Sequence, residues 1–246
     1  MKTIIFGRGS AAKRHARILT EMGHTFTDEP KEAEYAVIAS LTPNHARDLK
    51  ILSERGFSGT CLVEKPLFMC DDEAFKPDFP VYTAYQLRQH PVIISLRKAL
   101  DGVNVYSVGV HSGQHISLWR GTRIGLLRDY SHEIDLIHWL FGTMHDIITP
   151  PMIGDCVAIV CKAKDAVVLM QLNYLDLPPI RQFIVTTDKG TFVADLINNT
   201  LNGIKIEFHP DQPTKSMHET VLSGGENACI YDEGLEINRL IDRIES

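Results

Sequence analysis

The chain has 246 residues, 44% of them hydrophobic and 23% charged, which excludes an intrinsically disordered or collagen-like protein and allows one or two globular domains. Its 25 Lys and Arg against 31 Asp and Glu give a net charge of −6, which argues against nucleic acid or an anionic membrane as the main partner. No apolar run approaches the roughly 18 residues of a membrane-spanning helix. The first residues predict a strand and not a signal peptide, because their apolar part is short and ends at Gly7.

The five cysteines are scattered along the chain and include no C-x-x-C pair. This spacing disfavours a zinc site and a thioredoxin-like motif. We therefore expect free thiols in a protein of the reducing cytoplasm. The positions are Cys61, Cys70, Cys156, Cys161 and Cys229.

The first 85 residues alternate short apolar strands with helical segments. This alternation predicts a parallel, doubly wound sheet in a Rossmann-like domain that spans residues 1–89. The expected strands are residues 3–6, 35–40, 61–64 and 81–85, with a weaker one at 25–27, and the expected helices are residues 10–22 and 42–56.

From His90 onward, most of the expected strands follow one another without a helix between them. Residues 90–246 therefore predict an α+β domain with a largely antiparallel, open sheet. Asp188-Lys189-Gly190 is typical of a tight hairpin turn. The expected strands are residues 103–111, 156–162, 166–174, 182–187, 190–194 and 204–209, and the expected helices are residues 91–100, 131–141 and 231–244.

A glycine-rich turn joins the first expected strand to the first expected helix. Its residues follow the pattern G-x-G-x-x-A, in which Gly7 makes the tight turn, Gly9 lets the backbone approach a pyrophosphate, and Ala12 allows close packing of helix on strand. The free N–H groups at the start of the helix, beside Arg8 and Ser10, favour an anion. This context predicts dinucleotide binding, the alternative being a turn that only packs.

Asp28 lies about 20 residues beyond the turn, where an acidic residue binds the ribose hydroxyls of NAD. Only seven residues separate residues 25–27 from the next strand, whereas a parallel crossover usually takes a dozen or more. Residues 25–27 therefore differ from a standard second strand. Arg8, Lys13 and Arg14 are alternative ligands for the 2′-phosphate of NADP, or ordinary exposed helix charges. The choice between NAD and NADP stays open.

Glu64-Lys65-Pro66 ends a strand on the edge where doubly wound sheets bind ligands. A lysine there can donate a hydrogen bond to a carbonyl or hydroxyl group beside a hydride-accepting ring and stabilise a developing alkoxide. The alternative for Lys65 is an ordinary surface lysine beside a turn proline.

His132 lies at the start of the helix expected at 131–141, between Asp129 and Asp135. A histidine carries protons near neutral pH, and a neighbouring carboxylate fixes its tautomer and raises its basicity. The alternatives are a helix cap with an ordinary histidine, or a metal site, which lacks the His-x-x-x-His spacing.

Five motifs occur in an order that resembles the Gfo/Idh/MocA oxidoreductases, the relatives of glucose–fructose oxidoreductase and inositol dehydrogenase. The resemblance extends over most of the chain, because Pro178-Pro179-Ile180-Arg181 and Gly190-Thr191 resemble landmarks of the second domain of that family. The motifs are the G-x-G-x-x-A turn, Thr42-Pro43-Asn44-His45, Glu64-Lys65-Pro66, Tyr85-Gln86-Leu87-Arg88, and Ser131-His132-Glu133-Ile134-Asp135 followed by Trp139-Leu140-Phe141-Gly142.

The resemblance implies an NAD(P)-dependent dehydrogenase or reductase that acts on a sugar, a nucleotide-sugar or a cyclitol. It implies that Lys65 binds nicotinamide and substrate, that His132 accepts or donates the proton, and that Asp129 supports His132. Arg88, Trp119 and Arg120 are implied on the substrate side. The cofactor-binding set expected here is Gly7, Arg8, Gly9, Ser10, Ala12, Asp28, Ser40, Thr42, Asn44, His45, Glu64 and Lys65.

The chain also departs from the family pattern. The aspartate before the histidine is three positions away where four are common, Gln86 replaces the usual asparagine, and the second crossover and residues 67–80 are short. A non-catalytic dinucleotide-binding regulator, or an enzyme that has lost activity, is the alternative, and a reductase of a tetrapyrrole or an imine is a third. We expect a homodimer or higher homo-oligomer formed through the open sheet, by analogy with relatives.

Overall fold

The computed structural model describes residues 1–70, 74–118 and 123–245, and its contacts divide the chain into two units. Unit 1 comprises Met1–Gln89 and Pro210–Arg243, and unit 2 comprises His90–His209 with the last residues from Ile244. The division after Gln89 lies where the sequence changes from alternating strands and helices to strands that mostly follow one another without a helix between them. Residues 210–243, which we assigned to the second domain, belong to unit 1 because their two helices pack on the first sheet.

Unit 1 is built on a six-stranded sheet in the order β14-β5-β4-β3-β1-β2. Every neighbouring pair is parallel except β14 with β5. This confirms the predicted parallel α/β sheet. The strands are β1 (Lys2–Phe6), β2 (Thr25–Phe26), β3 (Tyr35–Ile38), β4 (Thr60–Val63), β5 (Val81–Thr83) and β14 (Cys229–Ile230).

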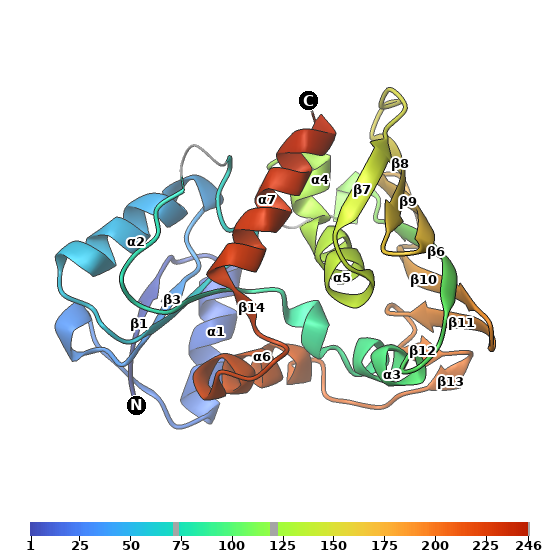
Figure 1. The fold of residues 1–246 in the computed structure, drawn as a ribbon. Coiled ribbons are helices and arrows are strands. Elements are labelled where there is room, and N and C mark those ends of the chain that lie inside the picture. Colours follow the sequence, from blue (N-terminus) through green and yellow to red (C-terminus); the bar gives the residue numbers. More distant parts are fainter. Residues whose placement is uncertain (71–73, 119–122, 246) are drawn as a thin grey trace. The chain divides into compact units, whose positions relative to one another are not determined.

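Helices cover both faces of this sheet, as a doubly wound fold requires (Figure 1). One apolar cluster joins α1 (Ser10–Glu21) and α6 (Gln212–Ser223) to one face, and a second joins α2 (His45–Glu54) and α7 (Tyr231–Glu245) to the other. The two clusters divide β3 by alternation, since Tyr35 and Val37 belong to the first and Ala36 and Ile38 to the second. Both faces are therefore buried, which explains the continuous apolar sequence of β3.

The second strand is shorter than in a standard Rossmann sheet but lies in the standard place. β2 pairs in parallel with β1, with Lys2 opposite Thr25 and Thr3 opposite Phe26. The chain then returns across β1 to β3 through a single 3-10 turn, Pro30–Glu32. The connection is short because β2 is the edge strand, so the chain has only one strand to cross.

Unit 2 carries an eight-stranded sheet in the order β13-β12-β11-β10-β6-β9-β8-β7. Only β6 and β9 pair in parallel, so the predicted, largely antiparallel sheet is confirmed. The strands are β6 (Val105–Gly113), β7 (Met144–Ile148), β8 (Cys156–Ala163), β9 (Ala166–Asn173), β10 (Ile180–Thr187), β11 (Gly190–Asp195), β12 (Thr200–Leu201) and β13 (Ile204–Lys205).

Helices α3 (Pro91–Ala99), α4 (Leu126–Asp129) and α5 (Ser131–Phe141) contact this sheet through β11, β9 and β8. Along β9 buried and exposed residues alternate, so that Val168 and Met170 are buried while Val167 and Leu169 are exposed. One face of the sheet is therefore packed and the other is open to solvent.

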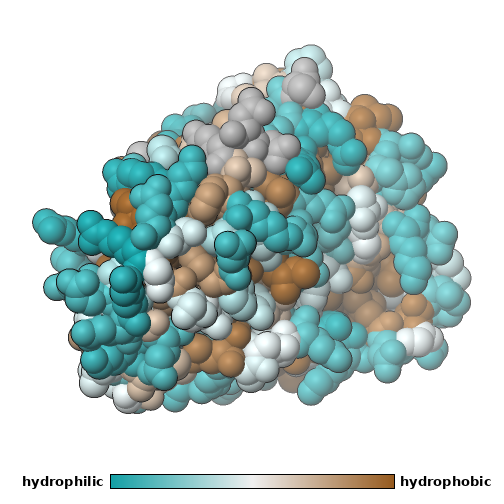
Figure 2. Space-filling view, turned by 60° about the vertical axis from the view of Figure 1, so that its left-hand side comes forward, coloured by the Kyte–Doolittle hydropathy of each residue, from teal (hydrophilic) through white to brown (hydrophobic). Residues whose placement is uncertain are grey.

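The surface shown in Figure 2 is mostly hydrophilic, with hydrophobic residues in separate patches. Within the described ranges, no helix has the length and apolar character needed to cross a bilayer. All five cysteines are free thiols, as their scattered spacing predicts.

Candidate functional site

The two glycines of the turn between β1 and α1 have different structural roles. Gly7 has a φ of +114°, and a Cβ there would lie 2.2 Å from the carbonyl oxygen of Ala39, so only glycine fits. Gly9 precedes α1 with a φ of −74°, and a Cβ there would meet no atom within 4 Å. Ala12 is buried and packs against the sheet. The open space beside Gly9 and the unpaired N–H groups of the first turn, which begins at Ser10, can accommodate a phosphate.

Asp28 lies two residues beyond the end of β2, after Thr27, and is exposed at the carboxyl end of the parallel strands. A cavity of about 280 Å³ opens beside it and is also lined by Phe6 at the end of β1 and by Arg55 after α2. Arg8 and Lys13 are exposed as well. The structure thus brings an acidic side chain to the expected side of the glycine turn.

The segment after β3 is held by its own polar contacts. Ser40 Oγ donates a hydrogen bond to Asp48 Oδ2 at 2.7 Å, and Thr42 and Asn44 form a 3-10 turn that leads into α2. His45 is fully buried, with Nδ1 3.1 Å from the carbonyl oxygens of both Pro66 and Leu67 and Nε2 3.2 Å from that of Ser40. Burial lowers the pKa of His45. His45 therefore links the Ser40 segment to the chain that follows Lys65.

A buried chain of hydrogen bonds holds the other end of the Lys65 segment. Glu64 Oε1 lies 2.9 Å from His15 Nε2, His15 Nδ1 lies 2.8 Å from His218 Nε2, and His218 Nδ1 lies 2.8 Å from Tyr35 Oη. Glu64 also accepts a hydrogen bond from the backbone N–H of Lys65 at 3.2 Å. These four side chains, from α1, α6, β3 and the residue after β4, form a relay that fixes Glu64, the residue that precedes Lys65.

The relay has one consistent direction when each imidazole carries one proton. Tyr35 donates to His218 Nδ1, His218 donates from Nε2 to His15 Nδ1, and His15 donates from Nε2 to Glu64. Burial, reinforced by the neighbouring His15, lowers the pKa of His218. Burial alone raises the pKa of Glu64, but the hydrogen bond from His15 and the nearby positive charges, including Arg14 at 3.6 Å, hold that pKa well below its usual range. The relay therefore ends on a carboxylate.

In unit 2, the junction of α4 and α5 presents Asp129 and His132, both 5% exposed, and the fully buried Asp135. Asp129 Oδ2 accepts a hydrogen bond from the phenol of Tyr174. Burial, together with this carboxylate, raises the pKa of Tyr174, so the phenol stays protonated and acts as a donor. The guanidinium of Arg123 lies over the Tyr174 ring, 4.0 Å from its centre.

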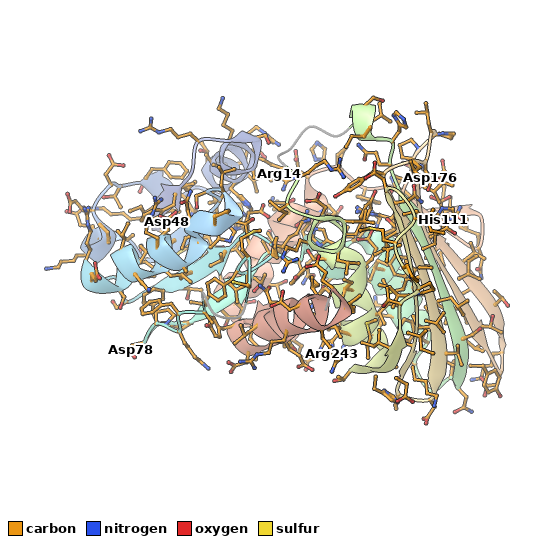
Figure 3. All side chains as sticks on the ribbon, turned by 90° about the horizontal axis from the view of Figure 1, so that it is seen from above. Arg14, Asp48, Asp78, His111, Asp176 and Arg243 are labelled. Carbon is orange, nitrogen blue, oxygen red and sulfur yellow. The ribbon has the colours of Figure 1, made fainter. Side chains whose placement is uncertain are left out.

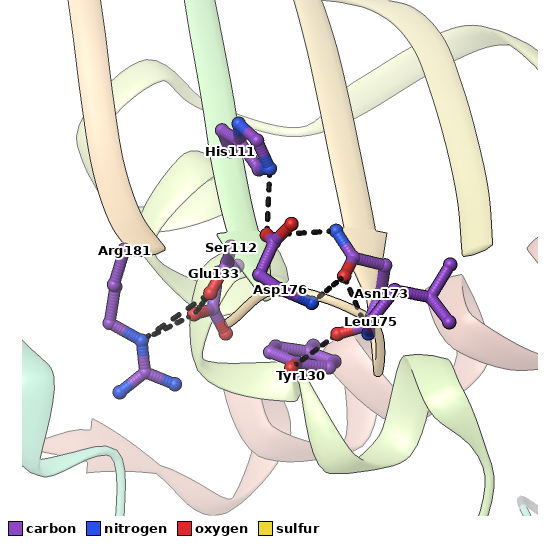
Figure 4. A network of polar contacts seen from close by, with 8 residues as sticks. All are labelled: His111, Ser112, Tyr130, Glu133, Asn173, Leu175, Asp176 and Arg181. Carbon is purple, nitrogen blue, oxygen red and sulfur yellow. Dashed lines mark hydrogen bonds and ion pairs between the residues drawn. The ribbon is translucent and has the colours of Figure 1, made fainter. Parts of the chain in front are cut away.

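The loop after β9 is tied to the end of β6. His111 Nε2 and Asn173 Nδ2 contact Asp176 Oδ2 at 2.8 and 3.0 Å. His111 and Asp176 lie side by side in Figure 3, and Figure 4 shows them facing each other. Tyr130 Oη donates to the carbonyl oxygen of Asn173 at 2.6 Å. Because Tyr174 follows Asn173, these bonds also fix the phenol that reaches Asp129.

Beside this loop, Glu133 accepts two hydrogen bonds on one oxygen. Ser112 Oγ donates to Glu133 Oε1 at 2.6 Å and Arg181 Nε donates to it at 2.7 Å (Figure 4). Glu133 is fully buried. Arg181 thus neutralises a carboxylate that burial would otherwise disfavour.

The structure describes one of the three predicted substrate residues, Arg88. Arg88 is 1% exposed, and its Nη1 donates to Glu233 of α7 at 2.8 Å, so this guanidinium is used inside unit 1. Trp119 and Arg120 lie outside the described residues. The contact of these three residues with a substrate stays a prediction.

His15, Tyr35, His218 and Tyr174 did not emerge from the sequence as site residues. His15 alone carries a usable signal, because it lies on the buried face of α1 with Ala12 and Leu19, where a polar side chain needs a partner. The other three reach the site only through tertiary structure.

Comparison with known proteins identifies a shared fold. Neither a protein-family model nor a curated protein sequence matches the chain. Among solved structures, UDP-N-acetylglucosamine 3-dehydrogenase GnnA from Acidithiobacillus ferrooxidans is 17% identical with a TM-score of 0.83, and the match covers 99% of this chain and 96% of GnnA.

Two WlbA dehydrogenases have the same fold. The enzyme from Thermus thermophilus, in complex with NAD and UDP-GlcNAcA, is 18% identical with a TM-score of 0.75, and the match covers 100% of this chain and 95% of the enzyme. The enzyme from Bordetella pertussis, in complex with NADH and UDP-GlcNAcA, is 16% identical with a TM-score of 0.80, and the match covers 99% and 95%. The chain thus adopts the two-domain fold of these dehydrogenases over nearly its full length.

Proposed function

We propose that this chain is an NAD(P)-dependent oxidoreductase of the Gfo/Idh/MocA type that acts on a hydroxyl-bearing carbon of a sugar, a nucleotide-sugar or a cyclitol. The observation that carries the proposal is the turn between β1 and α1, in which Gly7 is forced by contact with Ala39 while the space beside Gly9 is open. NAD is favoured over NADP because Asp28 lies at the end of β2, where a carboxylate binds the ribose hydroxyls and repels a 2′-phosphate.

The residues of unit 1 suit a dinucleotide. The first turn of α1 would bind the pyrophosphate, and Asp28 would bind the adenosine ribose. Lys65 follows a carboxylate held by the His15 relay and precedes a loop held by His45, so its backbone is fixed on both sides. When bound, the nicotinamide supplies a hydride acceptor or donor.

The proton chemistry is assigned to unit 2. His132 takes the proton of the substrate hydroxyl in the oxidative direction and returns it in the reductive direction. Asp129 orients the imidazole, and Tyr174 in turn holds Asp129 by a hydrogen bond. Lys65 stabilises the negative charge that develops on the substrate oxygen.

Two substitutions test this assignment. Lys65→Ala and His132→Ala should each lower turnover by about 100-fold or more while NAD still binds through the glycine turn, because general acid–base and electrostatic groups contribute on that scale. Substrates are screened among UDP-sugars, free sugars and cyclitols by the absorbance of NADH, with Lys50→Ala and His145→Ala as exposed controls. Binding of NAD without turnover of any of these compounds would favour the non-catalytic regulator, and unchanged turnover in both variants would contradict the assignment.

We also propose that a second copy of the chain covers the open face of the sheet in unit 2. Ile184 and Leu169 both lie opposite Gly109 in the strand register, so the missing side chain leaves a hollow between them. The hollow measures about 290 Å³, and Leu169 and Ile184 are 52% and 43% exposed. Paired apolar side chains around a hollow are typical of a surface that interdigitates with another sheet.

A further inference from the structure

Arg181, at the start of β10, forms its side-chain hydrogen bonds through Nε. Its Nε donates to Glu133, which is fully buried, whereas the Arg181 side chain itself is 29% exposed. Within the described part of the chain, Nη1 and Nη2 of Arg181 make no hydrogen bond or ion pair. Figure 4 shows both nitrogens pointing away from Glu133.

The surrounding structure fixes this orientation. Arg181 lies opposite Ser112 in the register of β10 and β6, and Ser112 donates to the same Glu133 oxygen. Glu133 lies in the first turn of α5, where the helix dipole stabilises a carboxylate. Since the guanidinium is planar, a bond at Nε sets the plane and leaves the Nη1–Nη2 edge as two parallel donors.

A preformed pair of donors of this kind matches two oxygens of a carboxylate or a phosphate. The ion pair with Glu133 is neutral as a whole, but its positive end faces outward and its negative end is buried. Glu133 Oε2 is buried and has no hydrogen-bond partner among the described residues, so the carboxylate depends on the bonds that its Oε1 receives from Ser112 and Arg181.

We propose that the Nη edge of Arg181 binds an oxyanion, a carboxylate or a phosphate, and that this group belongs to the substrate. The identification of the anion with the substrate rests on the proposed function. The anion site itself rests only on residues of unit 2, so it can be tested without NAD.

The test is binding of anions to the full chain in the absence of nucleotide, measured by titration calorimetry in the wild type and all variants and, in the wild type, also by NMR of the arginine Nε–H signals. The signal of Arg181 is assigned by its loss in Arg181→Lys. The probes are D-glucuronate, glucose 1-phosphate, UDP and, as the uncharged control, glucose. We expect saturable shifts of the Arg181 signal with at least one anionic probe and none with glucose, and the anion that binds most tightly distinguishes a carboxylate from a phosphate.

Three variants separate binding from folding. Arg181→Lys keeps the charge but loses the paired donors, and should weaken binding of the anion about tenfold, equal to about 1.4 kcal/mol. The Arg181→Gln/Glu133→Gln double variant leaves no buried charge unpaired, so it should fold and still fail to bind. Lys162→Gln removes a positive charge from an exposed ion pair in the same unit and should bind normally.

Two results would overturn the proposal. One is the absence of a saturable Arg181 shift with all three anions, and the other is wild-type affinity in the double variant. Neither depends on whether NAD binds, so failure of the anion site and failure of the oxidoreductase assignment are distinguishable.

Discussion

Removal of one imidazole from the buried relay should destabilise unit 1 by a predictable amount. His218 is fully buried and bonds to His15 and Tyr35, each at 2.8 Å. His218→Leu fills most of the same volume but leaves the acceptor of His15 and the phenol of Tyr35 without partners. A buried polar group without a partner costs about 1–3 kcal/mol, so the variant should lose about 2–6 kcal/mol of unfolding free energy.

A double-mutant cycle isolates the cause. In a Tyr35→Phe background the phenol is already absent, so the cost of His218→Leu should fall by about 1–3 kcal/mol. Urea unfolding followed by circular dichroism at pH 7.5 gives these values, with Glu219→Leu on the exposed face of the same helix as a control expected within about 0.5 kcal/mol of wild type. A cost below about 1 kcal/mol, or one that Tyr35→Phe leaves unchanged, would refute the relay.

Three further outcomes are expected. Burial, and then the charge of Arg181, lowers the pKa of His90 to about 4. The contribution of His90 to stability is therefore complete above pH 6.5 and is lost as pH falls toward 4, at up to about 1.4 kcal/mol per pH unit. His90→Asn, which can still cap α3, should reduce this slope of unfolding free energy against pH in urea unfolding, and an unchanged slope would exclude His90 as its source. Gly7→Ala should prevent stable folding of unit 1, because its Cβ would lie 2.2 Å from the Ala39 carbonyl oxygen, and a wild-type melting temperature would contradict the tight turn. Leu169→Lys on the open sheet should dissociate the proposed oligomer in sedimentation without lowering the melting temperature of the monomer, whereas an unchanged sedimentation coefficient would place the interface elsewhere.

Much of the fold can be predicted from the sequence because hydrophobic periodicity and glycine positions indicate the same element boundaries. The helix expected at 131–141 has the same bounds in the structure, since an apolar stripe ends at Gly142, whose φ is +90°. Helix α6 was missed because its buried face includes the polar Thr214 and His218, which interrupt the apolar pattern. Its sequence therefore shows too weak a stripe to indicate a helix.

The residues of the candidate site also fall into two groups, those in local motifs and those that only tertiary structure brings together. The local motifs around Gly9 and Lys65 are visible because their spacing is fixed by one strand and the turn that follows it. The relay cannot be predicted from the sequence, since His15 and His218 are 203 positions apart and meet only because α1 and α6 pack on the same face of the sheet. The role of Asp28 as a ribose ligand was ambiguous, because the short crossover argues against a second strand before it. The edge position of β2 explains how eight residues can return to the sheet.

The central claim is that the turn beside Gly9 binds a nicotinamide dinucleotide, and thermal unfolding with NAD, NADH, NADP and NADPH tests it most directly. At about 100 times Kd a ligand adds roughly 2.7 kcal/mol, which raises the melting temperature by roughly 5–10 °C for a chain of this size. Gly9→Asp should fold normally, because aspartate is a favourable N-cap, but its charge repels the pyrophosphate. The account predicts a shift with NAD and NADH in the wild type that Gly9→Asp abolishes; no shift with any of the four nucleotides, or the same shift in Gly9→Asp, would contradict it.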